Sequence, residues 1–466
     1  MALLAAWPAV THAQSSPAVS SLVAFSGSQP ASAPVLGPGG ALYGITSVVS
    51  VVAGGLIYRL EPTGSAVETL YQLKVSDGYG AVGGLLLGSG PDPVLFGTTT
   101  FGSSQQASSG GTVFSVKTDG KDFTVLHAFA SYAVANDLEQ PINTDGALPQ
   151  SELVEGNDGF LYGVTSAGGP NGTGVVFKVS RDGTGFAVLH AFGPVDLSDH
   201  DNDPATAAIV VPPIDGMSPT GTLLAGADDY LYGTAAAGGA NNTGTIFRVR
   251  SDGSDFEVLH TFPALVTPTT GVATNTGGAT PAAGLTDGQD SRHYGVASVG
   301  GNAGYGTVFA FDSVGRVFTV LHDFDFNKGA RPTGELLLGA DGKLYGTTAS
   351  GGTNASGTAT QFGTVFSIAR DGTGFTSLYS FQNTDGSGPT GKMVQLDEST
   401  FVGMTTAGGN CGQGTVFRLS LTGATVTGVT NCGRSSNNDS GGGGIAPALL
   451  LLLAVAGVAR RVRAGR

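Results

Sequence analysis

The sequence predicts an all-β protein, a seven-bladed β-propeller whose blades are four-stranded antiparallel sheets. Two observations predict it: a unit of four short apolar runs occurs seven times, and successive units lie 51 to 70 residues apart. Tandem four-stranded units at this spacing are typical of propellers, in which each sheet packs only against its neighbours. The unit is clearest at residues 334–381, which read GELLLGADGKLYGTTASGGTNASGTATQFGTVFSIARDGTGFTSLYSF.

Within this unit the apolar residues alternate over runs that end at glycine-containing turns, so we expect strands at residues 335–338, 344–348, 364–369 and 375–381. Asp341-Gly342 joins the first two strands and Asp371-Gly372 joins the last two. Asp-Gly favours a tight hairpin, because glycine accepts the positive φ of a primed turn and aspartate tolerates it. Each unit is therefore expected to be an antiparallel meander.

Two anchors define the repeat, a Leu-Tyr-Gly-like triplet on the second strand and a Gly-Thr-Val-Phe-like quartet on the third. The triplet glycines are Gly44, Gly97, Gly163, Gly233, Gly295, Gly346 and Gly403. The quartet glycines are Gly55, Gly111, Gly174, Gly244, Gly306, Gly363 and Gly414. Seven of each predict seven blades, which together occupy residues 14–432.

The chain begins with an apolar stretch, residues 1–13, that ends Thr-His-Ala before Gln14. Small residues at this point are typical of a signal-peptide cleavage site, so we interpret the stretch as the remnant of a secretory leader. The alternative is an N-terminus without ordered structure. A leader predicts an extracytoplasmic protein.

Residues 22–25, Leu-Val-Ala-Phe, look like a fourth strand that lacks the three preceding ones. In a closed ring such a strand belongs to the last blade, where it covers an otherwise open edge. We therefore expect it to pair with residues 416–420 or with residues 424–430. Because residues 424–430 could fill the same role, there are eight candidates for seven outer positions.

The connections between units are unequal, and their lengths predict where a site would lie. Long segments at residues 131–146, 194–217 and 263–278 fall on one face, whereas the opposite face has tight Asp-Gly turns such as Asp119-Gly120. Binding and catalytic residues are commonly carried by long loops on a rigid scaffold. A site is therefore expected on the long-loop face.

One long loop contains Asp199, Asp201 and Asp203, a candidate calcium site because alternating carboxylates suit a hard cation. The turn glycine and the closing glutamate of such loops are missing, and Pro204 follows directly. We therefore favour a solvated acidic insertion over a metal site. No other cofactor is predicted.

Two kinds of polar residue recur at equivalent positions and are interpreted as structural. A histidine or tyrosine ends the fourth strand in five units: His127, His190, His260, His322 and Tyr379. An asparagine follows the Gly-Gly of the loop between strands two and three: Asn171, Asn241, Asn302, Asn354 and Asn410. Asparagine stabilises turns by bonding its own backbone; a ring of such loops that binds a glycan is the less favoured alternative.

No catalytic signature is found. The sequence has no nucleophile elbow, no His-Glu-x-x-His and no P-loop, and no pair of glutamates can be assigned as acid and base. We therefore predict no catalytic residues and favour a non-enzymatic protein.

The charge excludes one class of partner. The net charge is −14, and without the four arginines of the C-terminal tail residues 14–444 carry −18. An acidic body repels phosphate backbones, so nucleic-acid binding is not expected. We expect a monomer.

The C-terminal region changes composition after the two cysteines of the chain. With a secretory leader, a disulfide between Cys411 and Cys432 is predicted to fasten the end of the ring. A Gly/Ser/Asn linker follows at residues 433–444, and residues 445–466 combine an uncharged apolar run with an arginine-rich tail. This hydrophobic segment is a candidate membrane anchor whose arginines favour a cytoplasmic end.

This arrangement resembles the GlyGly-CTERM sorting signal. The resemblance implies cleavage among Gly441, Gly442, Gly443 and Gly444 by an intramembrane rhombosortase, and transient membrane association before release to the bacterial surface or medium. A plain C-terminal anchor is the alternative.

The repeats resemble the GloVer tandem-repeat family of bacterial exported proteins through their Leu-Tyr-Gly-Thr-Thr, Gly-Gly-x-Asn and Gly-Thr-Val-Phe motifs. The first unit departs most, with Leu56-Ile57-Tyr58 in place of Thr-Val-Phe. The resemblance implies export and anchoring and carries no activity to particular residues. We therefore expect a surface-associated scaffold that binds a glycan or a protein. The alternative is a secreted hydrolase or lyase acting on polysaccharide.

Overall fold

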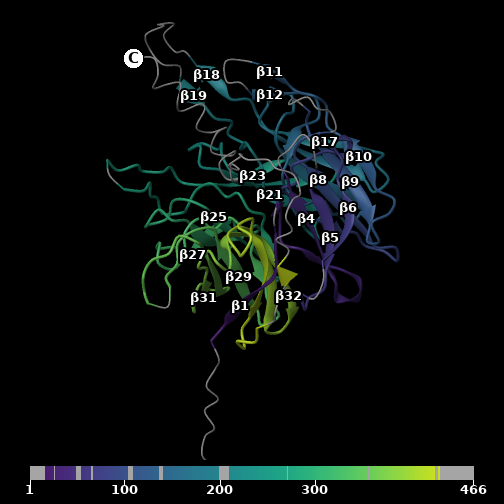
Figure 1. Ribbon diagram of the computed structural model, residues 1–466. Coiled ribbons are helices and arrows are strands. Elements are labelled where there is room, and N and C mark those ends of the chain that lie inside the picture. The colour runs from purple at the N-terminus through teal and green to yellow at the C-terminus, as the bar shows by residue number, and fades with distance from the viewer. Residues whose placement is uncertain are drawn as a thin grey trace, which may run out of the picture.

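The computed structural model describes residues 16–25, 27–48, 54–64, 67–102, 109–135, 140–198, 209–269, 271–354, 356–425 and 429–430. Within these ranges the chain forms a seven-bladed β-propeller of antiparallel four-stranded sheets, as predicted (Figure 1). The helices in the described ranges are two single turns, η1 (Pro38–Gly40) and η2 (Val75–Asp77). No helix within them is long and apolar enough to cross a membrane; residues 433–466 lie outside the described ranges.

The strands of the first four blades follow chain order from the innermost to the outermost. They are β3 (Val35–Leu36), β4 (Leu42–Ser47), β5 (Leu56–Leu60) and β6 (Val67–Gln72); β7 (Leu86–Leu87), β8 (Val94–Thr99), β9 (Thr112–Lys117) and β10 (Thr124–Ala128); β14 (Val154–Glu155), β15 (Phe160–Ala167), β16 (Val175–Ser180) and β17 (Ala187–Ala191); and β20 (Leu224–Ala225), β21 (Tyr230–Ala235), β22 (Thr245–Arg250) and β23 (Glu257–Thr261). The short strands β2 (Gln29–Pro30) and β13 (Ala147–Pro149) add to the second strands of blades one and three.

The remaining blades complete the ring. Their strands are β24 (Thr286–Asp287), β25 (Arg292–Ala297), β26 (Thr307–Asp312) and β27 (Val317–Asp323); β28 (Leu337–Leu338), β29 (Lys343–Thr348), β30 (Thr364–Ala369) and β31 (Thr376–Ser380); and β32 (Ser387–Asp397), β33 (Thr400–Ala407), β34 (Thr415–Ser420), β1 (Ala18–Ala24) and β35 (Val429–Thr430). The first strands of adjacent blades contact one another, as β28 contacts β24 and β32, which places them around the central channel.

The two anchors of the repeat face each other across the second and third strands. In blade six, Gly346 of β29 lies opposite Phe366 of β30, and a Cβ on Gly346 would lie 2.5 Å from the Cζ atom of Phe366. The same pairing occurs in the other blades, with Tyr58 replacing phenylalanine in the first. Glycine therefore recurs because an aromatic ring from the neighbouring strand lies over its backbone.

The N-terminal strand closes the ring, as predicted. β1 pairs antiparallel with β34, and β35 adds outside β1 in a parallel orientation, so blade seven has five strands. In Figure 1 the purple N-terminal strand runs among the yellow-green strands of this blade. Leu22 and Val23 are fully buried against blades one and seven. Both sequence candidates for the outer edge are therefore used, one beside the other.

One expectation of the sequence needs correction, and two long loops contain strands that the sequence did not predict. The first strands of blades one to six are two residues long, so β28 covers residues 337–338 rather than 335–338. The residues before β28 pack closely against blade seven, since a Cβ on Gly334 would lie 2.5 Å from the carbonyl oxygen of Gly391. Two long loops contain hairpins, β11 (Ala133–Ala135) with β12 (Gln140–Ile142) and β18 (Asp196–Ser198) with β19 (Ile209–Val211), which lie at the top of Figure 1.

Candidate functional site

One position on the channel wall differs from blade to blade, unlike the anchors. It is the residue just before a buried apolar residue near each first strand: a leucine in blades two to six, Pro34 in blade one and Met393, within β32, in blade seven. From blade one to blade seven it is Ala33, Gly84, Glu152, Thr222, Gly284, Glu335 and Lys392. Three of the seven side chains are ionisable, and we call these three the channel cluster: Glu152, Glu335 and Lys392.

Two members of the channel cluster form an ion pair between neighbouring blades. The Nζ atom of Lys392 lies 2.5 Å from Oε1 of Glu335. The Glu335 side chain is 13% exposed and that of Lys392 is 43% exposed. Burial lowers the pKa of Lys392, but the charge and hydrogen bond of Glu335 and the charge of Glu152 outweigh it, so the pKa is raised. The ammonium group is therefore retained in the channel wall.

The third member, Glu152, has no direct ion-pair or hydrogen-bond partner among the described residues. Burial raises the pKa of its carboxyl group to about 8, the negative charge of Glu335 adds to this, and the positive charge of Lys392 opposes it. The two glutamates therefore lie in different environments. Burial favours the neutral form of Glu152, whereas Glu335 is paired with an ammonium group.

Each carboxyl group lies over a glycine at the equivalent position of the preceding blade. A Cβ on Gly84 would lie 2.6 Å from Oε2 of Glu152, and one on Gly284 would lie 2.8 Å from Oε2 of Glu335. The Cβ on Gly84 would also lie 3.1 Å from Oγ of Ser32. The two glycines thus make room for the two carboxyl groups.

Hydroxyl groups from neighbouring blades hold the backbone of the channel wall. Thr98 of β8 donates a hydrogen bond of 3.1 Å to the carbonyl oxygen of Ser151, directly before Glu152. Thr286 of β24 donates one of 2.5 Å to the carbonyl oxygen of Leu336, directly after Glu335. The carboxyl groups are therefore carried by a rigid frame.

The recurring histidines share one packing arrangement, as the repeat predicts. Each imidazole stacks on a phenylalanine of the next blade, with ring centroids 3.6 Å apart for His127 and Phe186 and 3.5 Å apart for His190 and Phe256. The Nε2 atom of His127 lies 3.0 Å from Asp145. His190 has the same relation to Asp215.

The recurring asparagines mainly stabilise loops. Nδ2 of Asn171 donates to the carbonyl oxygen of Phe192 at 2.7 Å, and Nδ2 of Asn241 donates to that of Phe262 at 2.9 Å. Asn354 accepts hydrogen bonds from two backbone N–H groups of its own loop. These amides are engaged by the protein, which supports the turn interpretation.

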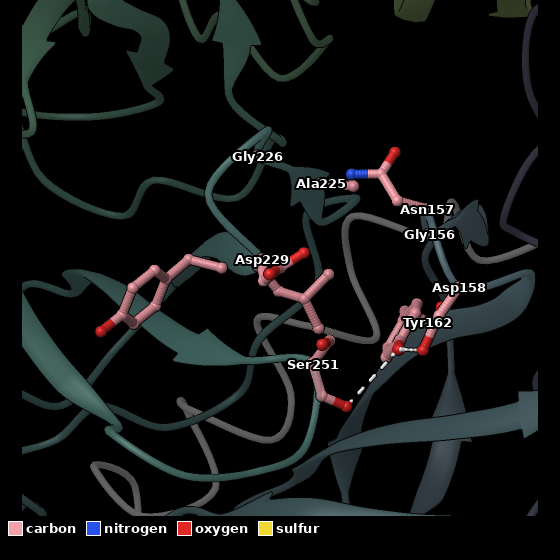
Figure 2. A pocket seen from close by; sticks show the side chains of 10 residues that line it. Gly156, Asn157, Asp158, Tyr162, Ala225, Gly226, Asp229 and Ser251 are labelled. Atoms are coloured by element: carbon pink, nitrogen blue, oxygen red, sulfur yellow. Dashed lines mark hydrogen bonds between the residues drawn. The ribbon is translucent and has the colours of Figure 1, made fainter.

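A small cavity of about 30 Å³ lies between blades three and four, and its lining is part of the repeat. Figure 2 shows Tyr162 turned toward Asp158 and Ser251 at its wall; the hydroxyl donates to Oδ2 of Asp158 at 2.6 Å. The same tyrosine–aspartate bond occurs in the next three blades, in Tyr232–Asp228, Tyr294–Asp290 and Tyr345–Asp341. Because the feature repeats, it stabilises a turn.

Several predicted site residues lie outside the described residues. Asp199, Asp201 and Asp203 fall between β18 and β19, and Gly441, Gly442, Gly443 and Gly444 follow the last described strand. Among the described residues no group of three or more His, Cys, Asp or Glu side chains could hold a metal ion. The calcium site and the cleavage site stay predictions.

The predicted disulfide is described at one end. Sγ of Cys411 lies 3.7 Å from the carbonyl oxygen of Ala24, and Ala24 pairs with Thr430 of β35. Cys432, two residues beyond Thr430, lies outside the described residues. The bond stays a prediction. Cys411 and β35, the described strand that precedes Cys432, both contact Ala24 of β1.

Sequence reasoning missed the channel cluster. Within a single unit, Glu152, Glu335 and Lys392 look like ordinary polar residues at the start of a strand. The signal that finds them is a comparison of equivalent positions, because the anchors repeat and this position does not.

Comparison with known proteins places the chain in a family. No curated protein sequence matches it significantly. Among solved structures, a GH74 xyloglucanase from Xanthomonas campestris is 12% identical with a TM-score of 0.50, and the match covers 84% of this chain and 52% of that one. An oligogalacturonate lyase in complex with manganese is 10% identical with a TM-score of 0.48, over 86% of this chain and 92% of that one. These likenesses concern the fold alone.

The family model described as the Gloeobacter/Verrucomicrobia repeat matches residues 10–210 and 213–362. The match covers most of the blades and agrees with the motifs of the repeat. The chain therefore belongs to the Gloeobacter/Verrucomicrobia repeat family.

Proposed function

We propose that this protein is an exported, surface-associated binding propeller whose ligand contacts the channel cluster. The observation that carries the proposal is that Glu152, Glu335 and Lys392 break the repeat at equivalent positions of the channel wall. A scaffold needs the same packing residue in every blade, whereas one ligand is contacted by different groups on different sides. A binding site in a repeat protein is expected where the packing residues are the same in every blade and one position in the channel wall differs between blades.

The position of the cluster along the channel supports access from the long-loop face. Glu152 and Glu335 precede β14 and β28, so they lie where the connection from the previous blade enters the channel wall, whereas Lys392 lies within β32. These connections include the two hairpins, β11–β12 and β18–β19. A ligand that enters from this side meets the loops first and the charged groups next.

Export and anchoring belong to the same proposal. The leader at residues 1–13, the predicted Cys411–Cys432 bond and the C-terminal sorting pattern support an extracytoplasmic site of action. A sorting protease that cleaves among residues 441–444 would release the propeller from its membrane segment. The ligand would then be a glycan or a protein met at the bacterial surface.

The binding proposal is tested with a panel of soluble neutral, acidic and amino oligosaccharides, using the purified protein and isothermal titration calorimetry. We expect at least one member to bind, its affinity to fall tenfold or more in Glu152→Gln, and its affinity to change in Lys392→Met. The matched control is Glu398→Gln, since Glu398 is an exposed glutamate in the turn between β32 and β33. Equal losses in the control and in the channel variants would contradict the proposal.

A polysaccharide hydrolase or lyase is the second candidate, favoured by the unlike environments of Glu152 and Glu335. A protonated carboxyl group and a carboxylate facing one channel are the groups that general acid–base catalysis uses. The assay is release of reducing ends or of unsaturated products from neutral and acidic polysaccharides. Activity that falls by about 100-fold or more in both Glu152→Gln and Glu335→Gln would establish it; activity unchanged in both variants would rule out this site.

A further inference from the structure

The channel wall contains the same three-blade pattern twice. Blades five, six and seven present Gly284, Glu335 and Lys392 at the varying position, and blades two, three and four present Gly84, Glu152 and Thr222. In both sets the glutamate lies over the glycine of the preceding blade. The sets differ in the third member, which is a lysine in one and a threonine in the other.

The first set shows what the third member does. Lys392 reaches back to the preceding blade and places its ammonium group 2.5 Å from the carboxylate of Glu335. Side chains at this position lean toward the preceding blade, since Glu152 and Glu335 do so as well. Thr222 is too short to reach Glu152 in the same way. Glu152 therefore lacks the lysine partner that Glu335 has, because the equivalent residue of the next blade is Thr222.

We propose that the channel binds a ligand bearing a primary ammonium group, which pairs with Glu152 as Lys392 pairs with Glu335. This inference rests on the proposed function and names the ligand class for that site. The protein itself provides the model for this interaction, because Glu335 and Lys392 form a carboxylate–ammonium pair at the equivalent positions of blades six and seven.

The charge of the molecule favours the same class of ligand. Residues 14–444 carry a net charge of −18, and an acidic body raises the local concentration of cations. Among the described residues, the charges that act on Glu152 are those of Glu335 and Lys392. A bound ammonium group offsets the repulsion from Glu335 and the burial that together disfavour the Glu152 carboxylate.

Binding is therefore linked to loss of a proton from Glu152. The ammonium ligand needs the carboxylate, whereas burial raises the pKa of Glu152 in the free protein to about 8. The proton passes to the buffer as the ligand binds. Apparent affinity should rise as the pH rises from 6 to 8, by about 50-fold if only the carboxylate form binds.

The test uses putrescine as the probe, because its two amines stay protonated over this pH range, and 1,4-butanediol as the neutral control of the same length. Calorimetry at pH 7 in buffers of different ionisation heat measures the protons released. We expect putrescine to bind with release of close to one proton and the diol not to bind. Glu152→Gln should weaken putrescine binding at least tenfold, and Glu398→Gln should leave it unchanged.

Two further variants test whether the ligand that binds at Glu152 is a cation. Thr222→Lys supplies the missing lysine within the chain, so it should abolish putrescine binding and raise the melting temperature. Lys392→Met removes the competing ammonium group, so it should tighten putrescine binding severalfold. An anionic ligand would pair with Lys392, so Lys392→Met would weaken its binding.

The outcomes distinguish this inference from the proposed function. If 1,4-butanediol or glutarate binds in a manner sensitive to Glu152→Gln or Lys392→Met and putrescine does not, the channel site stands and the ammonium class is wrong. If putrescine binds equally to wild type, Glu152→Gln and Thr222→Lys, the inference is overturned. If none of these probes or of the oligosaccharide panel responds to the channel variants, the proposed function fails as well.

Discussion

His260 occupies the same position in its blade as His127 and His190 but lacks their carboxylate partner. In blade three, Asp215 accepts hydrogen bonds from the backbone N–H of Gly193 as well as lying beside His190. In blade four, Gly277 replaces that aspartate and Pro263 replaces the residue that donates to it. Donor and acceptor are lost together, which leaves the Nε2 atom of His260 buried without a partner in the described part of the chain.

Restoring both residues should restore the pair. Burial lowers the pKa of His260 to about 4, and the double variant Pro263→Ala/Gly277→Asp should raise it, because a carboxylate favours the imidazolium. The single change Gly277→Asp should destabilise the fold, since its Cβ would lie 2.8 Å from Cδ of Pro263. NMR titration of the His260 ring measures the pKa; an unchanged value in the double variant would contradict this account.

The same histidine makes stability depend on pH. Its folded pKa of about 4 lies below the usual 6.5, so the unfolded chain binds more protons between these values. Stability contributed by neutral His260 is full above about pH 6.5 and is lost as the pH falls toward 4. His322, whose pKa burial also lowers to about 4, acts in the same direction. The double variant should weaken this dependence in urea denaturation between pH 4 and 7.

A second substitution breaks the repeat in the core. His293 stands where five other blades have leucine: Leu42, Leu95, Leu161, Leu231 and Leu344. Both of its ring nitrogens are buried without a partner among the described residues, and the ring contacts Tyr232 at 4.5 Å between centroids. Burial lowers its pKa. Burying two ring nitrogens without hydrogen-bond partners destabilises the fold by more than the contact with Tyr232 stabilises it.

His293→Leu should therefore stabilise the protein, by about 1 kcal/mol or more. The reverse change in a matched blade, Leu344→His, should destabilise it, because Leu344 is fully buried. Denaturant unfolding of both variants measures whether stability rises in His293→Leu and falls in Leu344→His. A loss of stability in His293→Leu would mean that the nitrogens have partners in solution.

At the scale of the strands, the pairing of glycine with an aromatic ring explains why two motifs recur together. Gly233 of β21 lies opposite Phe247 of β22, and a Cβ on the glycine would lie 2.5 Å from Cζ of the ring. Phe247 is fully buried, so the ring cannot swing away into solvent. The φ of Gly233 is not in the left-handed region, so packing alone requires glycine there.

Gly233→Ala should cost about 1–3 kcal/mol of stability through overpacking. Phe247→Leu alone leaves a cavity and is also destabilising. The double variant should be less destabilised than the sum, because the smaller side chain makes room for the new methyl group. A double-mutant cycle by urea denaturation measures the coupling, and additive effects would show that the two residues do not constrain each other.

The strands also show what the sequence can and cannot predict. The third strand of blade six was predicted at its observed bounds, Thr364–Ala369, because it alternates cleanly between turns. The contact of Gly346 with Phe366 could not be predicted, since it depends on the pairing register between two strands. The channel cluster was missed for a related reason. Glu152 and Lys392 are far apart in the chain and act on one another only once the ring is closed.

At the scale of the whole molecule, stability depends on a closure made by the two ends of the chain. β1 supplies the fourth strand of blade seven, and β35 then pairs with β1 on its outer side. Leu22, Val23 and Phe25 pack against Leu42 and Tyr58 of blade one and Val402 and Val416 of blade seven. The first and last blades thus share one core cluster that neither end could form alone.

Removing residues 14–27 should lower the melting temperature well beyond the effect of removing a tail without contacts. The deletion exposes the edge of β34 and a core to which each buried apolar side chain contributes about 1.5–3 kcal/mol. It also removes the strand with which β35 pairs, so β35 can compensate only by moving inward to β34. The control is removal of residues 1–13, which should leave the melting temperature unchanged. If deletion of residues 14–27 leaves it unchanged as well, β35 has taken the place of β1, and the ring is closed by the C-terminal end alone.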